Sequence, residues 1–285
     1  MKSILVPVAD RPECVFALDS AFRLAKSLGA SVAGCHVRPH REDKSGSNGN
    51  RLMEALESIG LDDVPEDVAS LNSRKASELF ARVAAKHAVV MARKRRLSAE
   101  TLAYWQEMVG TPDRLLGIVG PVSDLVVVSR PKKKSSGPAR AFLLAALLNS
   151  GRPVLVLPQK SVKPGKRVCI AWNCSVSSAR AVSAAMPVLQ LAESVHIVSC
   201  GKNSTPGPSI SHLKGYLAMW GVDASSEITR GRNDSKELLE QYQKSDSDLL
   251  VMGAYSRSHF RERILGGVTH AMLNESAVNL FALHS

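Results

Sequence analysis

The chain has 285 residues, too many for one small domain and enough for two domains of about 140 residues each. Hydrophobic residues make up 45% of the sequence and charged residues 22%, a balance that is typical of globular proteins and excludes long disordered regions. The formal net charge is +11, and no apolar run approaches the roughly 18 residues of a membrane-spanning helix, so no such helix is predicted.

The first residues and the cysteines predict a cytoplasmic protein with no membrane partner. Residues 1–8 carry one positive charge and a short apolar run, and Ala9-Asp10-Arg11-Pro12 follows without a small-residue cleavage site. The cysteines are odd in number and lack CxxC spacing, which is typical of buried thiols in a reduced compartment and not of a disulfide frame or zinc site. They are Cys14, Cys35, Cys169, Cys174 and Cys200.

In the first half, apolar runs predicted as strands alternate with stretches predicted as helices. Thr111-Pro112-Asp113 predicts a helix start, because a capping residue precedes proline at the first helical position. A polar loop over 40–50 and a long helical region over about 70–93 are predicted as insertions around a five-stranded plan. Strands are expected at 4–8, 123–129 and 153–157, and an amphipathic helix at 14–28.

A linker over 158–165, rich in Pro, Gly, Ser and Lys, leads into the second half. Strands there are continuous apolar runs, the pattern of strands that are buried on both faces. Asp234, with Glu237 three positions later, predicts a capping box at the start of a helix. The strands are expected near 167–172, 195–200, 225–230, 248–253 and 279–283, and the helices near 176–191, 209–220, 234–244 and 267–275.

Two internal similarities indicate a tandem duplication. Residues 4–10 resemble 169–174, since each apolar run ends in a polar turn before an Ala-rich helix, and 123–129 resemble 247–253. Strand–helix alternation with buried strands predicts parallel βαβ units. We therefore predict an α/β fold of two tandem doubly wound domains, 1–158 and 166–285. Each is a five-stranded parallel sheet in the order 3-2-1-4-5, flanked by helices.

A sheet of this order predicts where a ligand would bind. Ligands bind beyond the carboxyl ends of strands one and four, where the connections reverse direction. After strand four of the second half, the loop from Gly253 to Thr269 ends with Gly266-Gly267 at a helix start, and unpaired amides at such a start favour a phosphate chain. The competing explanation is that these glycines only form a strand-to-helix turn. Three arginines add positive charge to the loop: Arg257, Arg261 and Arg263.

This loop resembles the nucleotide loop of the universal stress protein family. Members that bind ATP carry G-2x-G-9x-G-(S/T) after strand four, and here Gly253 and Gly266 match the first and third glycines. Ser256 stands where the second glycine should be, and Gly267 replaces the Ser/Thr, with Thr269 two places further on. The resemblance covers nearly the whole chain and is strongest over 167–285.

The resemblance also implies the rest of the pocket, with ATP as its ligand. Family members bind the ribose with a carboxylate after strand one, and the matching residue here is Asn173, which keeps an acceptor oxygen but loses the charge. We expect these departures to weaken binding. The residues implied to line the pocket are Ala171, Val198, Met252 and Val268.

The resemblance implies a mode of pairing as well. Family domains pair through their fifth strands, which would set 154–157 beside 280–283 in an intramolecular pseudo-dimer. Both segments are strongly apolar, as covered edge strands are. A homodimer is an open alternative.

The first half lacks the matching site and carries most of the positive charge. No glycine stands at the first motif position after its fourth strand, and Ala9 occupies the carboxylate position. Residues 1–160 hold 24 Lys and Arg against 16 Asp and Glu, concentrated in Arg93–Arg96 and Lys132–Lys134. Such runs are typical of solvated surfaces. Because no aromatic residues interleave them, nucleic acid is not the expected partner, although it is the alternative explanation.

Other polar candidates have structural explanations. Trp172 is expected in the core, with adenine stacking as the alternative. Ser175, Ser177 and Ser178 lie at a helix start, where capping is expected and a nucleophile is the alternative. His259 and His270 have no partner at metal-ligand spacing, so no metal site is predicted.

The sequence thus predicts a stress-linked regulatory protein that binds a nucleotide, ATP, in its second domain. No general base is evident, so no catalytic residue and no efficient turnover are predicted. Two alternatives remain open: a nucleotide-free interaction module of the same family, and a nucleic-acid-binding protein that uses the basic first half.

Overall fold

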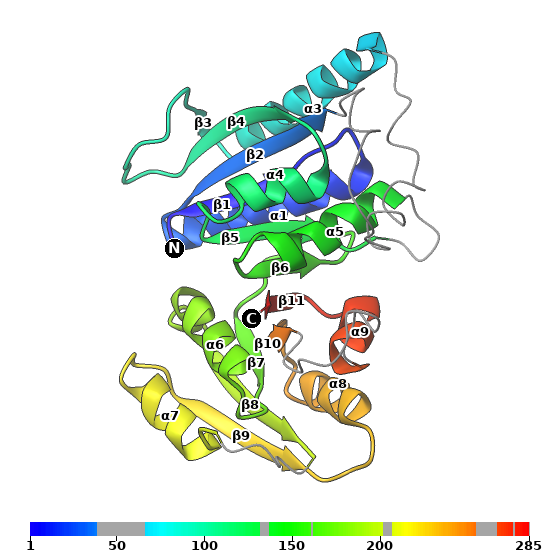
Figure 1. Cartoon of the computed structure of the whole chain (residues 1–285). Helices are drawn as coiled ribbons and strands as arrows, with labels where there is room; N and C mark the ends of the chain where they lie inside the picture. Colours follow the sequence, from blue (N-terminus) through cyan, green and yellow to red (C-terminus); the bar gives the residue numbers. More distant parts are fainter. Residues whose placement is uncertain are drawn as a thin grey trace. The chain divides into compact units, whose positions relative to one another are not determined.

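The computed structural model describes residues 1–38, 66–131, 137–160, 162–201, 207–254, 267–275 and 277–284. The chain divides into two compact units (Figure 1). Unit 1 comprises Met1–Arg152 with Gln159–Val162, and unit 2 comprises Pro153–Pro158 with Lys163–Ser285. In the part of the chain that is described, no helix has the length and apolar character needed to cross a membrane.

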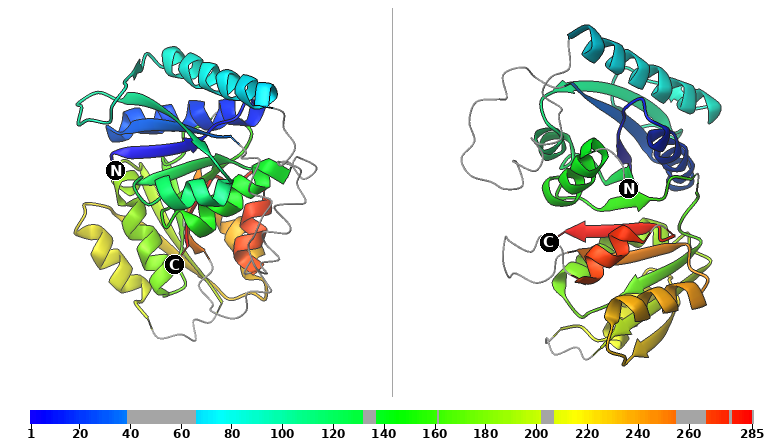
Figure 2. Two further views of the ribbon diagram at one scale, coloured as in Figure 1. Left: turned by 45° about the horizontal axis from the view of Figure 1, so that its top comes forward. Right: turned by 90° about the vertical axis from the view of Figure 1, so that its right-hand side faces the viewer.

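Unit 1 is a parallel sheet with the strand order β3-β4-β2-β1-β5. Helices α1 and α3 cover one face of this sheet, and α4 and α5 cover the other (Figure 2). Its elements are β1 (Ser3–Pro7), α1 (Pro12–Leu28), β2 (Ser31–Arg38), α3 (Glu66–Lys86), β3 (Val90–Met91), β4 (Leu102–Val109), α4 (Pro112–Val119), β5 (Leu125–Ser129) and α5 (Gly137–Asn149).

The order β4-β2-β1-β5 reproduces the predicted sequence third, second, first, fourth, with β3 added at the edge. The long helix predicted to reach residue 93 ends at Lys86, and β3 and the connection over 92–101 follow before β4. Ala88 adopts a positive φ of 52°, which ends helical geometry and turns the chain into β3. The helix prediction was therefore too long at its carboxyl end.

Unit 2 contains the full predicted order, since β9-β8-β7-β10-β11 runs third, second, first, fourth, fifth. Strand β6 pairs antiparallel with β11, with Leu155 opposite Phe281. Helices α6 and α7 lie on one face and α8 and α9 on the other (Figure 1). The elements are β6 (Val154–Leu157), β7 (Arg167–Ala171), α6 (Val176–Leu189), β8 (Ser194–Cys200), α7 (Ile210–Ala218), β9 (Ala224–Thr229), α8 (Asp234–Lys244), β10 (Leu249–Ala254), α9 (Gly267–Asn274) and β11 (Leu280–His284).

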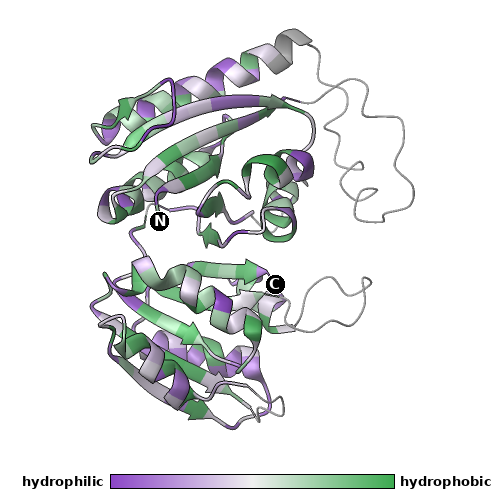
Figure 3. Cartoon of the chain, turned by 60° about the vertical axis from the view of Figure 1, so that its left-hand side comes forward, coloured by the Kyte–Doolittle hydropathy of each residue, from purple (hydrophilic) through white to green (hydrophobic). Residues whose placement is uncertain are grey.

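The central strands form the cores of both units. Ile4, Leu5 and Val6 of β1 are fully buried, as are Leu250 and Val251 of β10. Figure 3 shows hydrophobic residues along the central strands, while hydrophilic residues occur on the helices and on the outer strands. The predicted α/β fold of doubly wound parallel sheets is confirmed.

The repeated Ser-Asp pair has the same structural task in each unit. Asp124 accepts the backbone amide of Ser3 at 2.9 Å, just where β1 begins. Asp248 accepts the amides of Gly165 at 2.7 Å and Lys166 at 3.1 Å, just before β7. Each carboxylate therefore satisfies amides at the amino end of the first strand, which lies opposite the edge where ligands are expected.

Helix starts follow local polar chemistry, with two corrections. Pro112 takes the first helical position of α4 as predicted, but Thr111 before it makes no capping hydrogen bond through its side chain. The cap of α8 is Asn233 and not Asp234: its side chain accepts the amide of Lys236 at 3.0 Å. Glu237 closes the turn from the other side by accepting the Asn233 amide at 3.3 Å.

Candidate functional site

The strand order of unit 2 reverses between β7 and β10, which are hydrogen-bonded neighbours. Connections from β7 run outward through β8 and β9, while those from β10 run outward through β11. The carboxyl ends of β7 and β10 therefore frame the crevice in which open α/β sheets bind ligands. Residues 171–174 leave β7 at this edge, and residues 253–254 end β10 beside them.

Three of the predicted pocket residues form one row across the sheet. Ala171 is in register with Val198 of β8 and with Met252 of β10. Val198 and Met252 are buried, and Ala171 is partly exposed. Residues in register on parallel strands point to the same face, so the three side chains form a continuous apolar row close to the carboxyl edge, and only Ala171 in this row is partly exposed.

Gly253 brings β10 against the start of α6. A Cβ on Gly253 would lie 2.6 Å from the carbonyl carbon of Ser177 and 2.7 Å from the amide nitrogen of Ser178. Both are backbone atoms, so they cannot move aside cheaply. Since Gly253 faces α6, the adjacent Met252 and its row face the opposite side, where α8 and α9 pack. The strand-to-helix contact alone explains this glycine.

Gly267, Val268 and Thr269 form the first turn of α9. Gly267 is exposed, and a Cβ added there would meet no atom within 4 Å. Val268 is partly exposed, and Thr269 is buried. The amides of a first helical turn are the donors that bind anions at helix starts. Two further predicted residues, Ser256 and Gly266, lie outside the described residues, as do Arg257, His259, Arg261 and Arg263.

Asn173 sits in the turn after β7, where the family carries a carboxylate. Its side chain is exposed, and its Oδ1 accepts hydrogen bonds from Ser175 Oγ at 2.6 Å and from Ser175 N at 3.3 Å. Cys174, between them, has a positive φ of 60°. This tight turn holds the Asn173 oxygen at the edge of the crevice and orients it toward α6.

Ser175 caps α6, as its position predicts. Its hydroxyl accepts the amide of Ser178 at 3.1 Å and lies 3.0 Å from the Ser177 hydroxyl. Ser178 in turn donates to the Ser175 carbonyl at 2.8 Å. All three serines are thus engaged in helix capping and mutual hydrogen bonds, which accounts for them without nucleophilic chemistry.

Trp172 is a core residue, as expected. It is only 3% exposed, and its indole Nε1 donates to the carbonyl of Pro208 at 2.9 Å. Its amide continues the ladder to Val198 O at 2.8 Å. Sequence reasoning missed the segment that Trp172 holds: Gly207 lies so close to Cys174 O that a Cβ would come within 2.0 Å of it. The Gly207-Pro208 pair was the available signal.

The remaining titratable groups of unit 2 do not suggest acid–base chemistry at this edge. Burial raises the pKa of Cys169 to about 12, so this thiol stays protonated at neutral pH. Burial, and then the charge of Arg180, lowers the pKa of His284 at the end of β11. His270 lies 2.9 Å from the Asn274 amide within α9. Among the described residues, no group of three His, Cys, Asp or Glu side chains is placed to hold a metal ion.

The described residues at the corresponding edge of unit 1 leave only a small cavity. Between the ends of β1 and β5 there is a cavity of only about 40 Å³. Small-molecule sites usually need about 300 Å³ or more. Its lining is largely apolar: Pro7, Val8, Ala9, Arg11, Glu13, Cys14, Ala17, Val128, Ser129, Ala139 and Phe142. Burial raises the pKa of Cys14 to about 11, which keeps this thiol protonated too. The predicted basic run Lys132–Lys134 lies outside the described residues.

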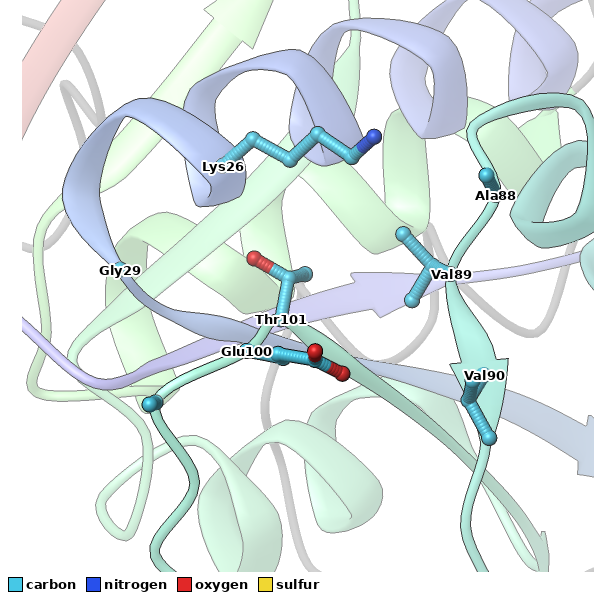
Figure 4. Close-up of a pocket in the computed structure, with 8 residues that line it drawn as sticks. Lys26, Gly29, Ala88, Val89, Val90, Glu100 and Thr101 are labelled. Atoms are coloured by element: carbon cyan, nitrogen blue, oxygen red, sulfur yellow. The ribbon is translucent and has the colours of Figure 1, made fainter.

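Unit 1 has a larger, more open hollow at the opposite edge of its sheet. Figure 4 shows this cavity of about 330 Å³, where the side chains of Lys26, Glu100 and Thr101 meet those of Val89 and Val90. It lies at the amino ends of β2, β3 and β4, away from the edge where α/β sheets bind ligands.

Comparison with known sequences gives two matches. Residues 172–284 match the sequence model of the universal stress protein family. A universal stress protein of Synechocystis is 25% identical over 269 residues, which cover 90% of each chain.

Comparison with solved structures supports the fold. A universal stress protein from Archaeoglobus fulgidus superposes with a TM-score of 0.70 at 17% identity, covering 99% of this chain and 96% of that chain. A structure from Pseudomonas aeruginosa gives a TM-score of 0.57 at 16% identity, covering 100% and 93%. At these identities the likeness shows the fold alone.

Proposed function

Since this chain belongs to the universal stress protein family, we propose that it is a stress-response regulator whose unit 2 binds an adenine nucleotide, with ATP as the ligand. The observation that carries the proposal is the reversal of strand order between β7 and β10, with the apolar row of Val198, Ala171 and Met252 beside it.

The residues at this edge fit a nucleotide in chemical type. The small side chain of Ala171 and the apolar row suit a flat base. Asn173 Oδ1 is an acceptor at the surface, as a ribose hydroxyl requires, although Ser175 already donates to it. Gly267 has open space around it and begins a helix, which suits a phosphate group. Gly253 does not add to this fit, because the start of α6 fills the space beside it.

In this proposal each part of unit 2 has one binding task. The row of β8, β7 and β10 holds the base, the turn of Asn173 holds the ribose, and the first amides of α9 hold phosphate oxygens. A bound ATP would supply charge to that helix start and would order the edge around it. The proposed role is binding and regulation, not turnover.

A nucleotide-free interaction module is the second candidate. It is favoured by a specific observation, the engagement of Asn173 Oδ1 by Ser175 at 2.6 Å within the chain itself. A carboxylate has more acceptor capacity than this single amide oxygen, so the self-contained turn competes with a ribose hydroxyl. The two candidates differ in one measurable property, the effect of nucleotide on stability.

The deciding experiment is thermal unfolding with ATP, ADP, AMP or buffer alone. A ligand that binds only the folded state at a hundred times its dissociation constant stabilises that state by about 2.7 kcal/mol, so ATP should raise the melting temperature. Mass spectrometry of the purified, denatured protein should release the same nucleotide. Absence of both signals would select the interaction module.

A substitution at Gly267 makes the experiment specific to the site. Gly267→Asp has room for its side chain and places a favourable negative charge at a helix start, so the unliganded protein should remain folded. The same charge repels a phosphate, so the ATP shift should disappear. Gly267→Asn is the matched neutral control and should keep the shift. An ATP shift that survives Gly267→Asp would mean that the nucleotide binds elsewhere.

A further inference from the structure

The connection between β3 and β4, residues 92–101, stands at the edge of the unit 1 sheet; we call it the β3–β4 loop. Figure 1 shows it projecting from the edge beyond β4. It carries the basic run that the sequence singled out and that the proposed nucleotide site does not use. All four side chains, from Arg93 to Arg96, are exposed.

In the described part of the chain, these four cations have no acidic partner. None of the four forms an ion pair with Asp or Glu there, whereas some exposed cations elsewhere do, such as Lys166 with Glu193 at 2.7 Å. Glu100, the one acid in the loop, lies at its far end beside β4 and lines the hollow of Figure 4 together with Lys26. The loop therefore presents a concentrated and uncompensated positive charge.

The loop is held to β4 at its start and in its middle, and one hydrogen bond within the loop adds to these. Ala92 donates its amide to Ala103 O of β4 at 2.8 Å, and Ser98 Oγ accepts the amide of Glu100 at 3.1 Å. Tyr104, which is 8% exposed, accepts the Arg96 amide at 3.2 Å through its hydroxyl. Fixed backbone at these points lowers the conformational entropy lost when the cations meet a partner.

Exposed aliphatic side chains flank the cations on both sides. Leu97, directly after Arg96, is 88% exposed, while Val90 and Met91 of β3 are 60% and 43% exposed. Single exposed aliphatics are common on protein surfaces. Three that bracket four unpaired cations combine the two chemical features of peripheral membrane contacts, positive charge for headgroups and aliphatic groups for the acyl boundary.

A nucleic acid would also meet the positive charge, but it would use different neighbours. Proteins that hold single strands stack the bases on exposed aromatic rings. The loop contains no aromatic residue, and Tyr104 beneath it is buried and engaged with Arg96. The aliphatic residues thus favour a lipid surface over a nucleic acid. A peripheral contact of this kind needs no spanning helix, which is the feature that the sequence lacks.

We propose that the β3–β4 loop docks unit 1 reversibly on anionic lipid surfaces, with Arg93–Arg96 at the headgroups and Leu97 at the acyl boundary. Each basic residue near such a surface contributes about a fivefold factor to the partition coefficient. Four of them give binding that salt weakens strongly, because the attraction acts within a Debye length of about 8 Å at physiological ionic strength.

Vesicle flotation of the full-length protein tests this proposal, with phosphatidylglycerol–phosphatidylcholine vesicles against phosphatidylcholine alone. The wild type should float only with the anionic vesicles and should dissociate as salt is raised. Replacing Arg93, Lys94, Arg95 and Arg96 together by Ser should lower the partition coefficient by about a hundredfold or more. The exposed position of the loop keeps this variant foldable, which circular dichroism verifies.

A charge-matched control separates the loop from the overall charge of the protein. It replaces four exposed cations elsewhere, Lys75, Arg82, Arg230 and Arg232, by Ser, and it should change the partition coefficient by no more than about threefold. Leu97→Ser removes no charge and should weaken vesicle binding by about threefold while leaving binding to single-stranded DNA unchanged.

Each other outcome overturns the proposal. Equal losses in the loop variant and the control would assign any lipid binding to net charge alone. Binding of single-stranded DNA that depends on Arg93–Arg96, without flotation on anionic vesicles, would assign the loop to nucleic acid. Failure of the wild type to float at low salt would leave the loop as solvated surface.

Discussion

The two units share one scaffold and differ at the same edge. Counting from their first strands, Ala9, Arg11 and Cys14 of unit 1 correspond to Asn173, Ser175 and Ser178 of unit 2. In unit 2 these positions form a hydroxyl and amide cluster at an exposed turn. In unit 1 they line a cavity of about 40 Å³ that holds a protonated thiol. The two units therefore share the sheet and differ in the side chains at its carboxyl edge.

The conserved part of this comparison lies in the backbone. Val8 N donates to Cys35 O at 2.8 Å, and Trp172 N donates to Val198 O at the same distance. Asp124 and Asp248 hold the amino ends of the first strands in both units. Residues that satisfy backbone groups keep their type in both copies, whereas side chains at the carboxyl rim are free to diverge.

The substitution with the greatest predicted loss of stability is at Gly253, whose counterpart in unit 1 is Ser129. Ser129 has room for its side chain and donates to Glu13 O at 2.5 Å, while any Cβ at 253 meets the backbone of Ser177 at 2.6 Å. Gly253→Ala should therefore destabilise unit 2 by about 2 kcal/mol without any nucleotide present. Urea unfolding of the unliganded protein measures this loss.

Two controls define that result. Gly267→Ala, at the other motif glycine, has open space and should be neutral or slightly stabilising, by about 0.5 kcal/mol. Ser129→Ala loses one hydrogen bond and should cost about 1 kcal/mol in unit 1. If Gly253→Ala were as harmless as Gly267→Ala, the close contact with α6 would not be the reason for glycine at 253.

A second prediction concerns ATP affinity and the turn after the first strand of each unit. Asn173→Asp restores the carboxylate that family members carry, and a charge-assisted hydrogen bond to a ribose hydroxyl should tighten ATP binding about tenfold. The Asp oxygen can still accept from Ser175, so the unliganded stability should change little. Isothermal titration calorimetry measures the affinity.

Unit 1 supplies the matched substitution. Ala9→Asp places the same carboxylate at the corresponding turn, beside a cavity of only about 40 Å³, and there it should create no ATP binding. A gain at both positions would show that charge alone recruits the nucleotide. No gain at Asn173 would argue that the ribose does not lie at this turn, and the proposed orientation of the ligand would fail.

The sequence predicted the fold of unit 2 almost element by element, because its strands are uninterrupted apolar runs between clear turn signals. It was less successful in unit 1. Strand β4 was not anticipated, since Leu102–Val109 mixes Tyr, Trp, Gln and Glu and its last residues are partly exposed. Strand β3, with two exposed residues, gives no periodic signal. Strands that are buried on both faces are the easiest to predict from sequence, because they form continuous apolar runs.

For the candidate site, glycine spacing located the right edge but could not separate two reasons for glycine. Gly253 is required by a contact with α6, which lies 75 residues earlier in the sequence and leaves no local signal. Gly267 has no such contact. Only the tertiary contacts distinguish these two cases, because the pattern G-2x-G-9x-G contains both kinds of glycine without separating them.

A last and smaller difference between the two units is predicted for their stability at acidic pH. Burial lowers the pKa values of His196 and His284 in unit 2 below the ordinary value of 6.5. The unfolded chain then binds more protons than the folded one as pH falls below 6.5, so the stability that unit 2 has above this pH declines. In unit 1, a hydrogen bond from Ser73 lowers the pKa of Glu107 below 4.5, so its contribution is lost only at lower pH. Hydrogen exchange between pH 6.5 and 4.5 should therefore show unit 2 losing protection first.

The double variant His196→Gln, His284→Gln should remove that difference, because glutamine takes up no proton in this range. Earlier loss in unit 1 would reverse the contrast and point to another group that titrates there.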